Sequence, residues 1–217
     1  MRIISDEEFK EVFVAENIMG RLINKNVDRE WLSGIPHRTF LDMYIIYQVD
    51  ISVLFNQPGY VQIAIIDNDV ANMMSMREDD LYLAALTNGN RDAYVANIKE
   101  FIGLGDEVYD PLEDDLLIIT NRNNRFGAFS ICCSQVLLSV AERIGDDFII
   151  LPGSIHDMCA AKIFPDMDFE YIKRTAADVS HMIQSDEDFL TENIYIYIYR
   201  VKENAIDSVS GGWRWHL

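Results

Sequence analysis

The chain has 217 residues, of which 49% are hydrophobic and 25% are charged, a composition typical of globular rather than disordered proteins. Its 18 Lys and Arg residues stand against 36 Asp and Glu residues, which gives a formal net charge of −18 at pH 7. An acidic surface repels phosphate backbones and anionic lipids, so we expect no direct nucleic-acid partner and no membrane partner. The sequence contains no run of about 18 apolar residues, so no transmembrane helix is expected.

Acidic residues occur in short clusters along the whole chain. A surface with this distribution of charge could imitate a polyanion and occupy a basic groove on another protein, in the manner of an inhibitor. Alternatively, the clusters are helix starts and loops of a soluble protein, where carboxylates favour the positive end of the helix dipole. The clusters are 6–8, 78–80, 113–115, 146–147 and 186–188.

The three cysteines predict neither a disulfide framework nor a zinc site. Cys132 and Cys133 are adjacent, whereas structural zinc sites separate paired ligands by roughly two to four residues. Cys133 falls on the apolar stripe of a predicted helix, so we expect a core cysteine, no metal and no cofactor. The few cysteines, together with an acidic segment over 6–8 where a signal peptide would be apolar, predict a cytoplasmic protein.

The first half of the chain predicts short helices beside a β-hairpin. Apolar side chains at three- and four-residue spacings predict a helix over 6–23, and a Gly-Ile-Pro segment ends a short helix over 28–32. Strand-forming residues over 41–51 and 60–66, separated by a Pro-Gly turn, predict the hairpin. Three more helices are expected: one that Asp67 caps and that runs to Met74, one that begins at 78–80 and is interrupted by Asn88-Gly89-Asn90, and one over 92–102.

The second half is more strongly patterned. Apolar spacing predicts two amphipathic helices, one over 129–144 that ends at Gly145 and one over 169–183. Residues 194–199 alternate Ile and Tyr, so a strand there has an all-Ile face and an all-Tyr face, and we expect the Tyr face in the core. The other expected strands are 116–120, 148–151 and 155–163, the last reached through a turn at Pro152-Gly153.

This order of elements predicts an α+β fold, with a mixed, mainly antiparallel sheet and helices packed on one face. We expect a single domain over 1–217, in which 103–111 is the stretch that could subdivide it because it holds Gly, Pro and acidic residues. The Trp-containing end, 208–217, is expected to be a flexible aromatic tail that docks on the body of the protein or on a partner.

A loop over 120–127, between a predicted strand and a predicted helix, is the best candidate for a small-ligand site. Such a loop presents backbone N–H groups, and Arg122 and Arg125 could clamp an anion in front of the helix start at Gly127. The loop lacks the Lys-Ser/Thr end of a P-loop, and Asn-rich turns also occur without a ligand. An enzyme or receptor for a small anionic or phosphate-bearing ligand is therefore the alternative function.

Two further polar groups are ligand-binding candidates. His37, Arg38 and Asp42 lie near a predicted strand start, where Asp42 could orient the imidazole and Arg38 could hold an anion. The structural alternative is that His37 and Arg38 satisfy loop carbonyls and pair with Asp42. His156 shares a strand face with Ser154, but the sharp strand-to-helix turn of a nucleophilic serine is missing, so we expect no Ser–His catalysis there.

Several of these stretches resemble an uncharacterised bacterial family, domain of unknown function 5688. The resemblance covers most of residues 20–200, is most specific over residues 145–157, and includes the Ile-Pro-His-Arg-Thr-Phe-Leu-Asp stretch at 35–42. Gly153 and Asp157 stand where the family usually has Ser and Glu. The family brings no established reaction or cofactor, so the resemblance implies only the fold and the cytoplasmic setting.

We therefore expect a non-catalytic protein–protein interaction module whose partner has a basic surface. This expectation rests on the acidic composition and on three features that the sequence lacks: a nucleophile elbow, metal-ligand spacing and a cofactor loop. Its sharpest form is an inhibitor or polyanion mimic. The sequence leaves open the identity of the partner and the oligomeric state.

Overall fold

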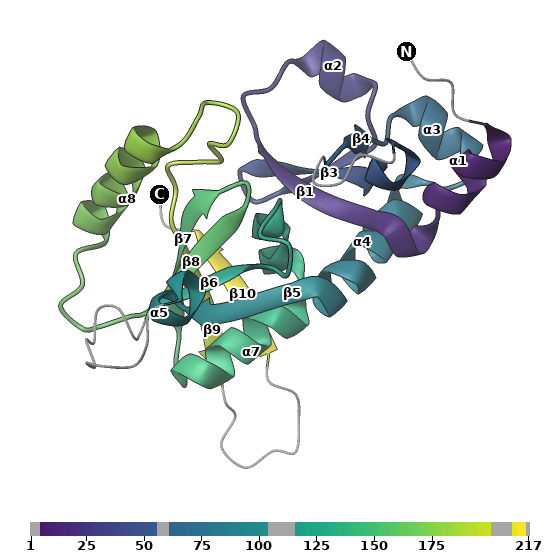
Figure 1. The fold of residues 1–217 in the computed structure, drawn as a ribbon. Helices are drawn as coiled ribbons and strands as arrows, with labels where there is room; N and C mark the ends of the chain where they lie inside the picture. Colours follow the sequence, from purple (N-terminus) through teal and green to yellow (C-terminus); the bar gives the residue numbers. More distant parts are fainter. Residues whose placement is uncertain (1–4, 56–60, 104–115, 201–209, 216–217) are drawn as a thin grey trace. The chain divides into compact units, whose positions relative to one another are not determined.

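The structure is a computed structural model that describes residues 5–55, 61–103, 116–200 and 210–215 (Figure 1). The chain divides into two compact units, Met1–Arg91 and Asp92–Leu217. The division falls where α4 (Glu78–Asp92) meets β5 (Ala93–Asn97), and most of the stretch 103–111 lies outside the described residues. A single domain over 1–217 stays a prediction.

The first unit contains a four-stranded sheet with β3 (Met43–Asp50) at its centre. β1 (Ile18–Asn24) pairs along one edge of β3, while β2 (His37–Phe40) and β4 (Ile63–Ile65) share the other edge, all antiparallel. The pairing of β3 with β4 confirms the predicted hairpin. Because β3 has neighbours on both edges, it supplies much of the core, with Met43, Ile45, Tyr47 and Val49 fully buried.

The prediction of one helix over 6–23 is wrong beyond its first turns. α1 (Asp6–Val12) ends at Val12, a 3-10 turn, η1 (Ala15–Asn17), follows, and the chain then enters β1. Ile18, Gly20 and Leu22 are buried in alternation, and this two-residue period is that of a strand. The mixed apolar spacing fits a helix as well as a strand. The segment forms a strand because all of its residues pair with β3.

Two short helices form where the sequence predicts them: α2 (Arg29–Ser33), capped by Asp28, and α3 (Asn68–Met73), capped by Asp67. A second 3-10 turn, η2 (Ser52–Phe55), follows β3. α4 runs without interruption through Asn88-Gly89-Asn90, where the sequence predicted a break. The buried Asn88 amide donates hydrogen bonds to the carbonyls of Ala15 and Ile18 at 2.8 and 2.9 Å, so a tertiary contact takes the place of the local turn bond that favours Asn in loops.

The second unit contains a six-stranded sheet in the order β10-β9-β7-β8-β6-β5, and every described pairing is antiparallel. The prediction of a helix over 92–102 is wrong for its first half, because β5 pairs with β6 there. α5 (Ile98–Ile102) begins only after Asn97, whose side chain accepts from the Glu100 N–H. The remaining strands are β6 (Leu116–Asn121), β7 (Phe148–Ser154), β8 (Asp157–Lys162), β9 (Tyr195–Arg200) and β10 (Ser210–Trp215).

Two segments of this sheet differ from the sequence predictions. β7 and β8 are joined through Ile155 and His156, whereas Pro152 and Gly153, the predicted turn, lie within β7 where its register to β8 shifts. Residues 210–215 of the expected flexible tail form β10, which pairs with β9. The other residues of that tail lie outside the described part of the chain.

Helices lie on both faces of the second sheet. η3 (Gly127–Cys132), a 3-10 helix, and α7 (Ser134–Ile144) take the place of the helix predicted over 129–144, and α7 packs against β5, β8 and β9. α8 (Phe169–Ile183) forms over the predicted range and packs against β7 (Figure 1). None of the helices in the described residues has the length and hydropathy that crossing a membrane requires.

The core of the second unit lies on the face that α7 covers. Side chains alternate along a strand, and Phe148 and Ile150 of β7 are fully buried on this face. Tyr195 and Tyr197 of β9 are buried with them, which confirms the expected core position of the Tyr face, and the rings of Tyr197 and Phe148 stack at 5.0 Å. The α+β class is confirmed, with two antiparallel sheets in place of the one mixed sheet that the sequence predicted. The predicted packing of helices on one face differs from the second unit, because α8 lies on the face opposite to α7.

Candidate functional site

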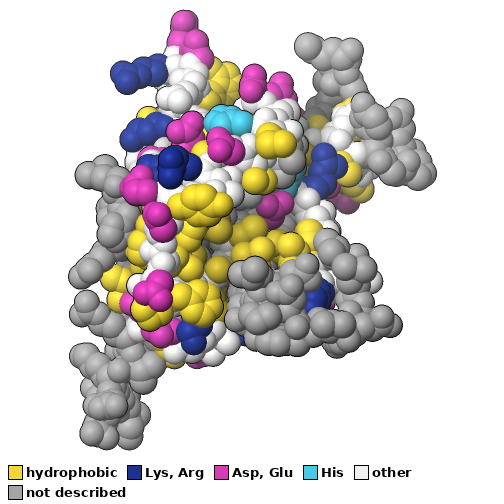
Figure 2. Space-filling model, turned by 90° about the vertical axis from the view of Figure 1, so that its left-hand side faces the viewer, with side chains coloured by type: hydrophobic (Ala, Val, Ile, Leu, Met, Phe, Trp, Pro, Cys, Tyr) yellow, Lys and Arg dark blue, Asp and Glu magenta, His cyan; other side chains and the backbone are white. Residues whose placement is uncertain are grey.

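A groove of about 560 Å³ runs between α8 and the strands β7 and β8, all within the second unit. Figure 2 faces this side and shows hydrophobic side chains gathered along it, with Asp and Glu side chains at their border. The volume falls in the range of about 300–1,000 Å³ that is usual for ligand pockets. We call this cavity the α8 groove, and its apolar lining includes Leu151, Pro152, Cys159, Ile172, Ala176 and Val179.

α8 forms one wall of the groove because its apolar residues lie on one side of a well-capped helix. Asp168 accepts the Tyr171 N–H at 3.0 Å, which satisfies a free donor of the first turn. The described chain covers the apolar side chains of α8 only in part: Tyr171, Val179 and Met182 are 60%, 47% and 83% exposed. Large apolar side chains left this open on neighbouring helical turns are typical of a binding surface.

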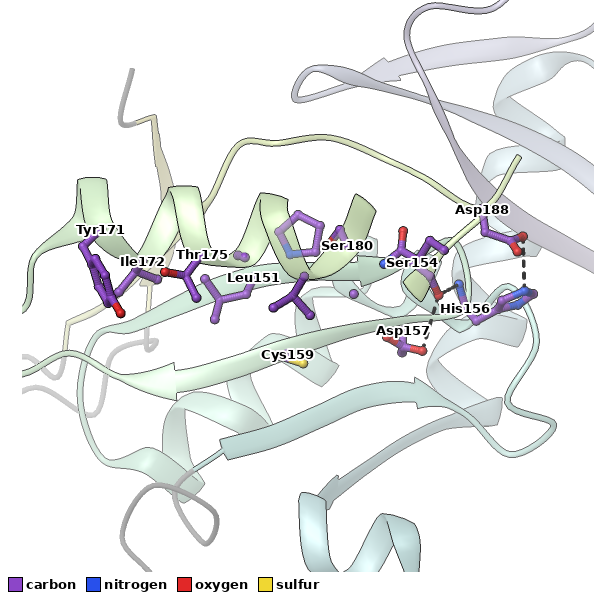
Figure 3. A pocket seen from close by; sticks show the side chains of 15 residues that line it. Leu151, Ser154, His156, Asp157, Cys159, Tyr171, Ile172, Thr175, Ser180 and Asp188 are labelled. Carbon is purple, nitrogen blue, oxygen red and sulfur yellow. Dashed lines mark hydrogen bonds and ion pairs between the residues drawn. The ribbon is translucent and has the colours of Figure 1, made fainter. Parts of the chain in front are cut away.

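The opposite wall is set by the pairing of β7 with β8. Leu151 and Cys159 are direct partners in this pair, so both side chains point to the same face, towards α8 (Figure 3). Burial, and to a lesser extent the nearby Asp157, raises the pKa of the Cys159 thiol to about 12. Cys159 is therefore a thiol at neutral pH and contributes apolar surface rather than a nucleophile.

One end of the groove is polar, and acceptors dominate it. Asp157, Asp188 and Gln184 line this end, and the buried Oε1 atom of Gln184 has no hydrogen-bond donor among the described residues. Ser154 donates to Asp157 Oδ2 at a long 3.4 Å, and Ser185 donates to Asp188 Oδ2 at 2.9 Å. We call Asp157, Gln184 and Asp188 the acceptor end of the groove; Tyr171 lies at the other end (Figure 3).

Asp157 is a carboxyl in the groove whose pKa is perturbed by burial. Desolvation raises its pKa, while the charge of His156 and the hydroxyl of Ser154 act in the opposite direction. Gly153 makes room for it, because a Cβ atom at position 153 would lie 1.9 Å from Asp157 Oδ1. A partly buried carboxyl held by one long hydrogen bond is a group that a cation or a hydrogen-bond donor would stabilise.

His156 is placed at the acceptor end, but its ring is engaged in holding loops together. Its Nδ1 accepts the Phe126 N–H at 3.0 Å, so the neutral ring carries its proton on Nε2, 3.5 Å from Asp188 Oδ1 (Figure 3). Its backbone N–H, rather than its ring, contacts Ser154 Oγ, at 2.9 Å. The imidazole therefore ties three segments together and is not positioned to activate Ser154.

Arg122, Arg125 and Gly127 lie in a loop whose backbone donors are used internally. The N–H groups of residues 123 and 125 both reach the Asn121 side chain, at 3.1 and 3.2 Å. Those of residues 122, 124 and 126 reach Asp92, Asn121 and His156. An anion site there stays a prediction, and it would have to rely on the two arginine side chains, because five successive N–H groups already have acceptors.

Gly127 is constrained by its surroundings. A Cβ atom at this position would lie 2.3 Å from Thr120 Oγ1, 2.5 Å from Asn121 N and 2.7 Å from the His156 carbonyl oxygen. Two of these three neighbours are backbone atoms that cannot move aside easily. This crowding gives Gly127 a structural role at the start of η3, whether or not the loop binds a ligand.

The first unit holds the other polar candidates, His37, Arg38 and Asp42, and their contacts are described within that unit. The His37 ring contacts the Ile35 carbonyl at 2.7 Å, so the loop-carbonyl interpretation holds for this side chain. Asp42 is half-buried in the turn between β2 and β3. The Arg38 guanidinium binds Glu78 in a bidentate pair at 2.9 and 2.6 Å and reaches Asp79 at 2.7 Å.

Glu78 completes a polar cluster that the sequence did not predict. It also accepts from the hydroxyl of the buried Tyr47, and the Arg38 guanidinium lies 3.8 Å from the centre of the Tyr82 ring. The hydrogen bond to Glu78 raises the pKa of Arg38, and burial raises that of Tyr47. Satisfied charges of this kind tie β2 and β3 to the first turn of α4, which is a structural task.

Asp157, Gln184, Asp188 and the exposed side chains of α8 are the groove residues that sequence reasoning missed as a site. The sequence did show the amphipathic helix and the acidic cluster over 186–188. Nothing local indicated that α8 would pack against β7 and still leave a groove between the helix and the sheet. Among the described residues, no three His, Cys, Asp or Glu side chains are grouped closely enough to hold a metal ion.

Comparison with known proteins gives one finding. A family model described as a family of unknown function, DUF5688, matches residues 5–199, which is most of the chain and includes every element that forms the α8 groove. Comparison with curated proteins and with solved structures gives no match. The chain therefore belongs to the DUF5688 family.

Proposed function

We propose that this chain is a non-catalytic interaction protein that binds a partner protein with a basic surface through the α8 groove. The observation that carries the proposal is the groove itself: an apolar cavity of about 560 Å³ in whose α8 wall Tyr171 and Val179 are 60% and 47% exposed. A single protein seldom leaves such side chains in water along one helix unless a partner covers them.

The charge of the chain supports a basic partner. The net charge is −18, and the segment that closes the acceptor end of the groove carries Asp186, Glu187, Asp188 and Glu192 without an intervening Lys or Arg. Opposite charge would accelerate association and select partners, while the apolar groove would supply affinity. In its sharpest form the protein is an inhibitor or polyanion mimic that occupies a basic site on its target.

The contacts in the groove favour binding over catalysis. Two lining residues of the nucleophile type are Ser154 and Cys159. The Ser154 hydroxyl lies against a carboxylate and not an imidazole, and a pKa of about 12 keeps the Cys159 thiol protonated. The three cysteines of the described chain are free thiols, which supports a reducing compartment such as the cytoplasm.

The test is affinity capture from a lysate of the source organism with three immobilised proteins: wild type, Val179→Lys and Leu83→Lys. Val179 lines the groove, whereas Leu83 is an exposed apolar residue of α4 in the other unit, so the two variants carry the same change at different places. We expect a stoichiometric basic protein on wild type and on Leu83→Lys, lost with Val179→Lys and in high salt.

Equal capture by all three proteins would contradict the groove as the contact surface. The rival function, a receptor or enzyme for a phosphate-bearing ligand, makes a different prediction. Phosphate would raise the melting temperature, and Arg125→Ala would abolish that rise. A phosphate effect together with no captured protein would replace the proposal by its rival.

A further inference from the structure

We infer that the α8 groove binds its partner in one orientation, as an extended segment with a Lys or Arg side chain at the acceptor end and apolar side chains along α8 towards Tyr171. The inference rests on the proposed function and adds which sequence the groove selects. It follows from the unequal chemistry of the two ends of the groove.

The acceptor end can receive hydrogen bonds but has few to give. Asp157 and Asp188 are carboxylates, and the buried Gln184 Oε1 has no donor among the described residues. None of the 15 lining residues is Lys or Arg, so no side chain of the lining neutralises the two carboxylates by ion pairing of that kind. Ser154, Ser185 and the His156 ring are internal donors here, and each is already directed at one carboxylate oxygen.

The helix itself adds to this polarity. Ser180 and Gln184, which line the groove, belong to the last turn and the C-cap of α8, where the carbonyl end of the helix dipole is negative. A carboxylate placed there is disfavoured and a cation is favoured. A guanidinium or ammonium group offers several N–H donors at once, which matches two carboxylates and an unpaired amide oxygen.

The rest of the groove selects apolar side chains. Leu151, Ile172 and Val179 present only carbon atoms, and Cys159 is a protonated thiol. From Tyr171 to Gln184 the helix rises about 20 Å, at about 1.5 Å per residue. An extended segment covers that length with about six residues. Met182, which is 83% exposed and outside the cavity lining, adds apolar surface on the same helix, and this favours a protein segment over a small amine.

The experiment is a selection of displayed random 12-residue peptides on four full-length proteins. These are wild type, the groove-blocking Val179→Lys, Asp188→Asn, and the control Asp186→Asn, which removes the same charge from an exposed neighbour outside the groove lining. Circular dichroism confirms folding of each. Asp157→Asn serves as a second acceptor-end variant if Asp188→Asn, which loses contacts to His156 and Ser185, does not fold.

We expect wild-type peptides to share one Lys or Arg at a fixed distance from two or three apolar residues within a six-residue stretch. Binding of such a peptide should weaken about tenfold with Asp188→Asn or Asp157→Asn and stay unchanged with Asp186→Asn. Peptides that depend on Val179 but carry no basic residue would overturn this inference and leave the proposed function standing. No enrichment over Val179→Lys would overturn the proposed function.

Discussion

Gly127 is the first residue of η3, and it lies close to the turn that contains His156. A Cβ atom there would lie 2.5 Å from Asn121 N and 2.7 Å from the His156 carbonyl, both backbone atoms. We expect Gly127→Ala to lower the free energy of unfolding by about 2–3 kcal/mol, because the strand and the turn must separate to admit a methyl group. Urea denaturation measures this loss.

Gly145→Ala is the matched control for that substitution. Gly145 ends α7 at φ 78°, and nothing lies within 4 Å of a Cβ atom there. Its cost should therefore be the backbone cost alone, about 1 kcal/mol. Gly127 does not have a positive φ, so its loss measures crowding, and a Gly127→Ala chain as stable as wild type would show that crowding there contributes nothing.

Asp157 makes stability depend on pH in an unusual direction. Burial raises its pKa in the folded chain, so the folded state holds this proton more tightly than the unfolded state, where the pKa is about 4. Stability is then lost as the pH rises above about 4 towards the folded value. Asp157→Asn cannot ionise, and it should therefore be more stable than wild type at pH 7 and equal to it at pH 3.5.

Urea midpoints of wild type and Asp157→Asn at the two pH values test this expectation. Asp186→Asn, at an exposed position, controls for the change in net charge. A midpoint for Asp157→Asn below that of wild type at pH 7 would mean that the carboxylate makes a stabilising contact there. If Asp157 serves binding at the expense of stability, Asp157→Asn should be more stable than wild type and should bind the peptide more weakly.

At the scale of elements, one ion pair joins α4 to the sheet of the first unit. Arg38 of β2 binds Glu78 in the first turn of α4, and both side chains are about 30% exposed or less. We expect Arg38→Met to destabilise the chain by about 2 kcal/mol, since it leaves Glu78 beside the Tyr47 hydroxyl without its cation.

Arg77→Met provides the comparison for Arg38→Met at the same end of α4. Arg77 pairs with Asp80 at 3.3 Å, but its side chain is 81% exposed, so water can replace the pair and the urea midpoint should not change. Combining Arg38→Met with Glu78→Gln should restore part of the stability, because the uncompensated charge is removed. Equal effects of the two arginine variants would argue against a structural role for the Arg38–Glu78 pair.

The two long helices of the second unit differ in how much of their apolar surface is covered. α7 buries Val136, Leu137, Val140 and Ala141, whereas Val179 of α8 is 47% exposed and Met182 is 83% exposed. Amide hydrogens of α8 should therefore exchange faster than those of α7. A peptide bound in the groove should slow exchange in α8 and leave α7 unchanged. Mass-spectrometric hydrogen exchange measures both, and slower exchange in free α8 than in α7 would contradict this reading of the packing.

At the scale of the whole molecule, the sequence predicts elements best where one period is unambiguous. α8 occupies the predicted range 169–183, and the alternation of Ile and Tyr over 194–199 correctly places the Tyr face in the core. The sequence prediction is wrong over 18–24 and 93–97. The local pattern of these residues also fits helices, but long-range pairing with β3 and β6 makes them strands. Local spacing carries no information about such partners.

The candidate site can be predicted only in part, because its residues come from distant parts of the sequence. The sequence singles out His156 as a candidate ligand-binding residue, which stays a prediction, and the structure places it in the lining of the α8 groove. The role of its ring depends on Phe126 and Asp188, which lie 30 and 32 positions away in the sequence. The α8 groove arises from the distance between a helix and two strands, which no single segment encodes. Cavities follow from tertiary packing, whereas charges and periods can be read locally.

The net charge of −18 predicts two opposite responses to salt. Raising NaCl from about 10 to 100 mM shortens the screening length from about 30 to about 10 Å. Screening weakens repulsion among the carboxylates of the folded chain, so the melting temperature should rise, by about 2–5 °C. It also weakens attraction to a basic peptide in the α8 groove, so the dissociation constant should increase over the same series.

Thermal melts and peptide titrations in one NaCl series measure both responses, and KCl in place of NaCl should give the same values. A Val179→Lys chain should retain the rise in melting temperature but lose the peptide, because its change of one charge is small beside the total of −18 and falls within the groove. Peptide binding that salt does not weaken would assign the affinity to apolar contacts with α8 alone. A melting temperature that falls with salt would mean that attractive ion pairs, of the kind that Arg38 makes, outweigh the repulsion among the carboxylates.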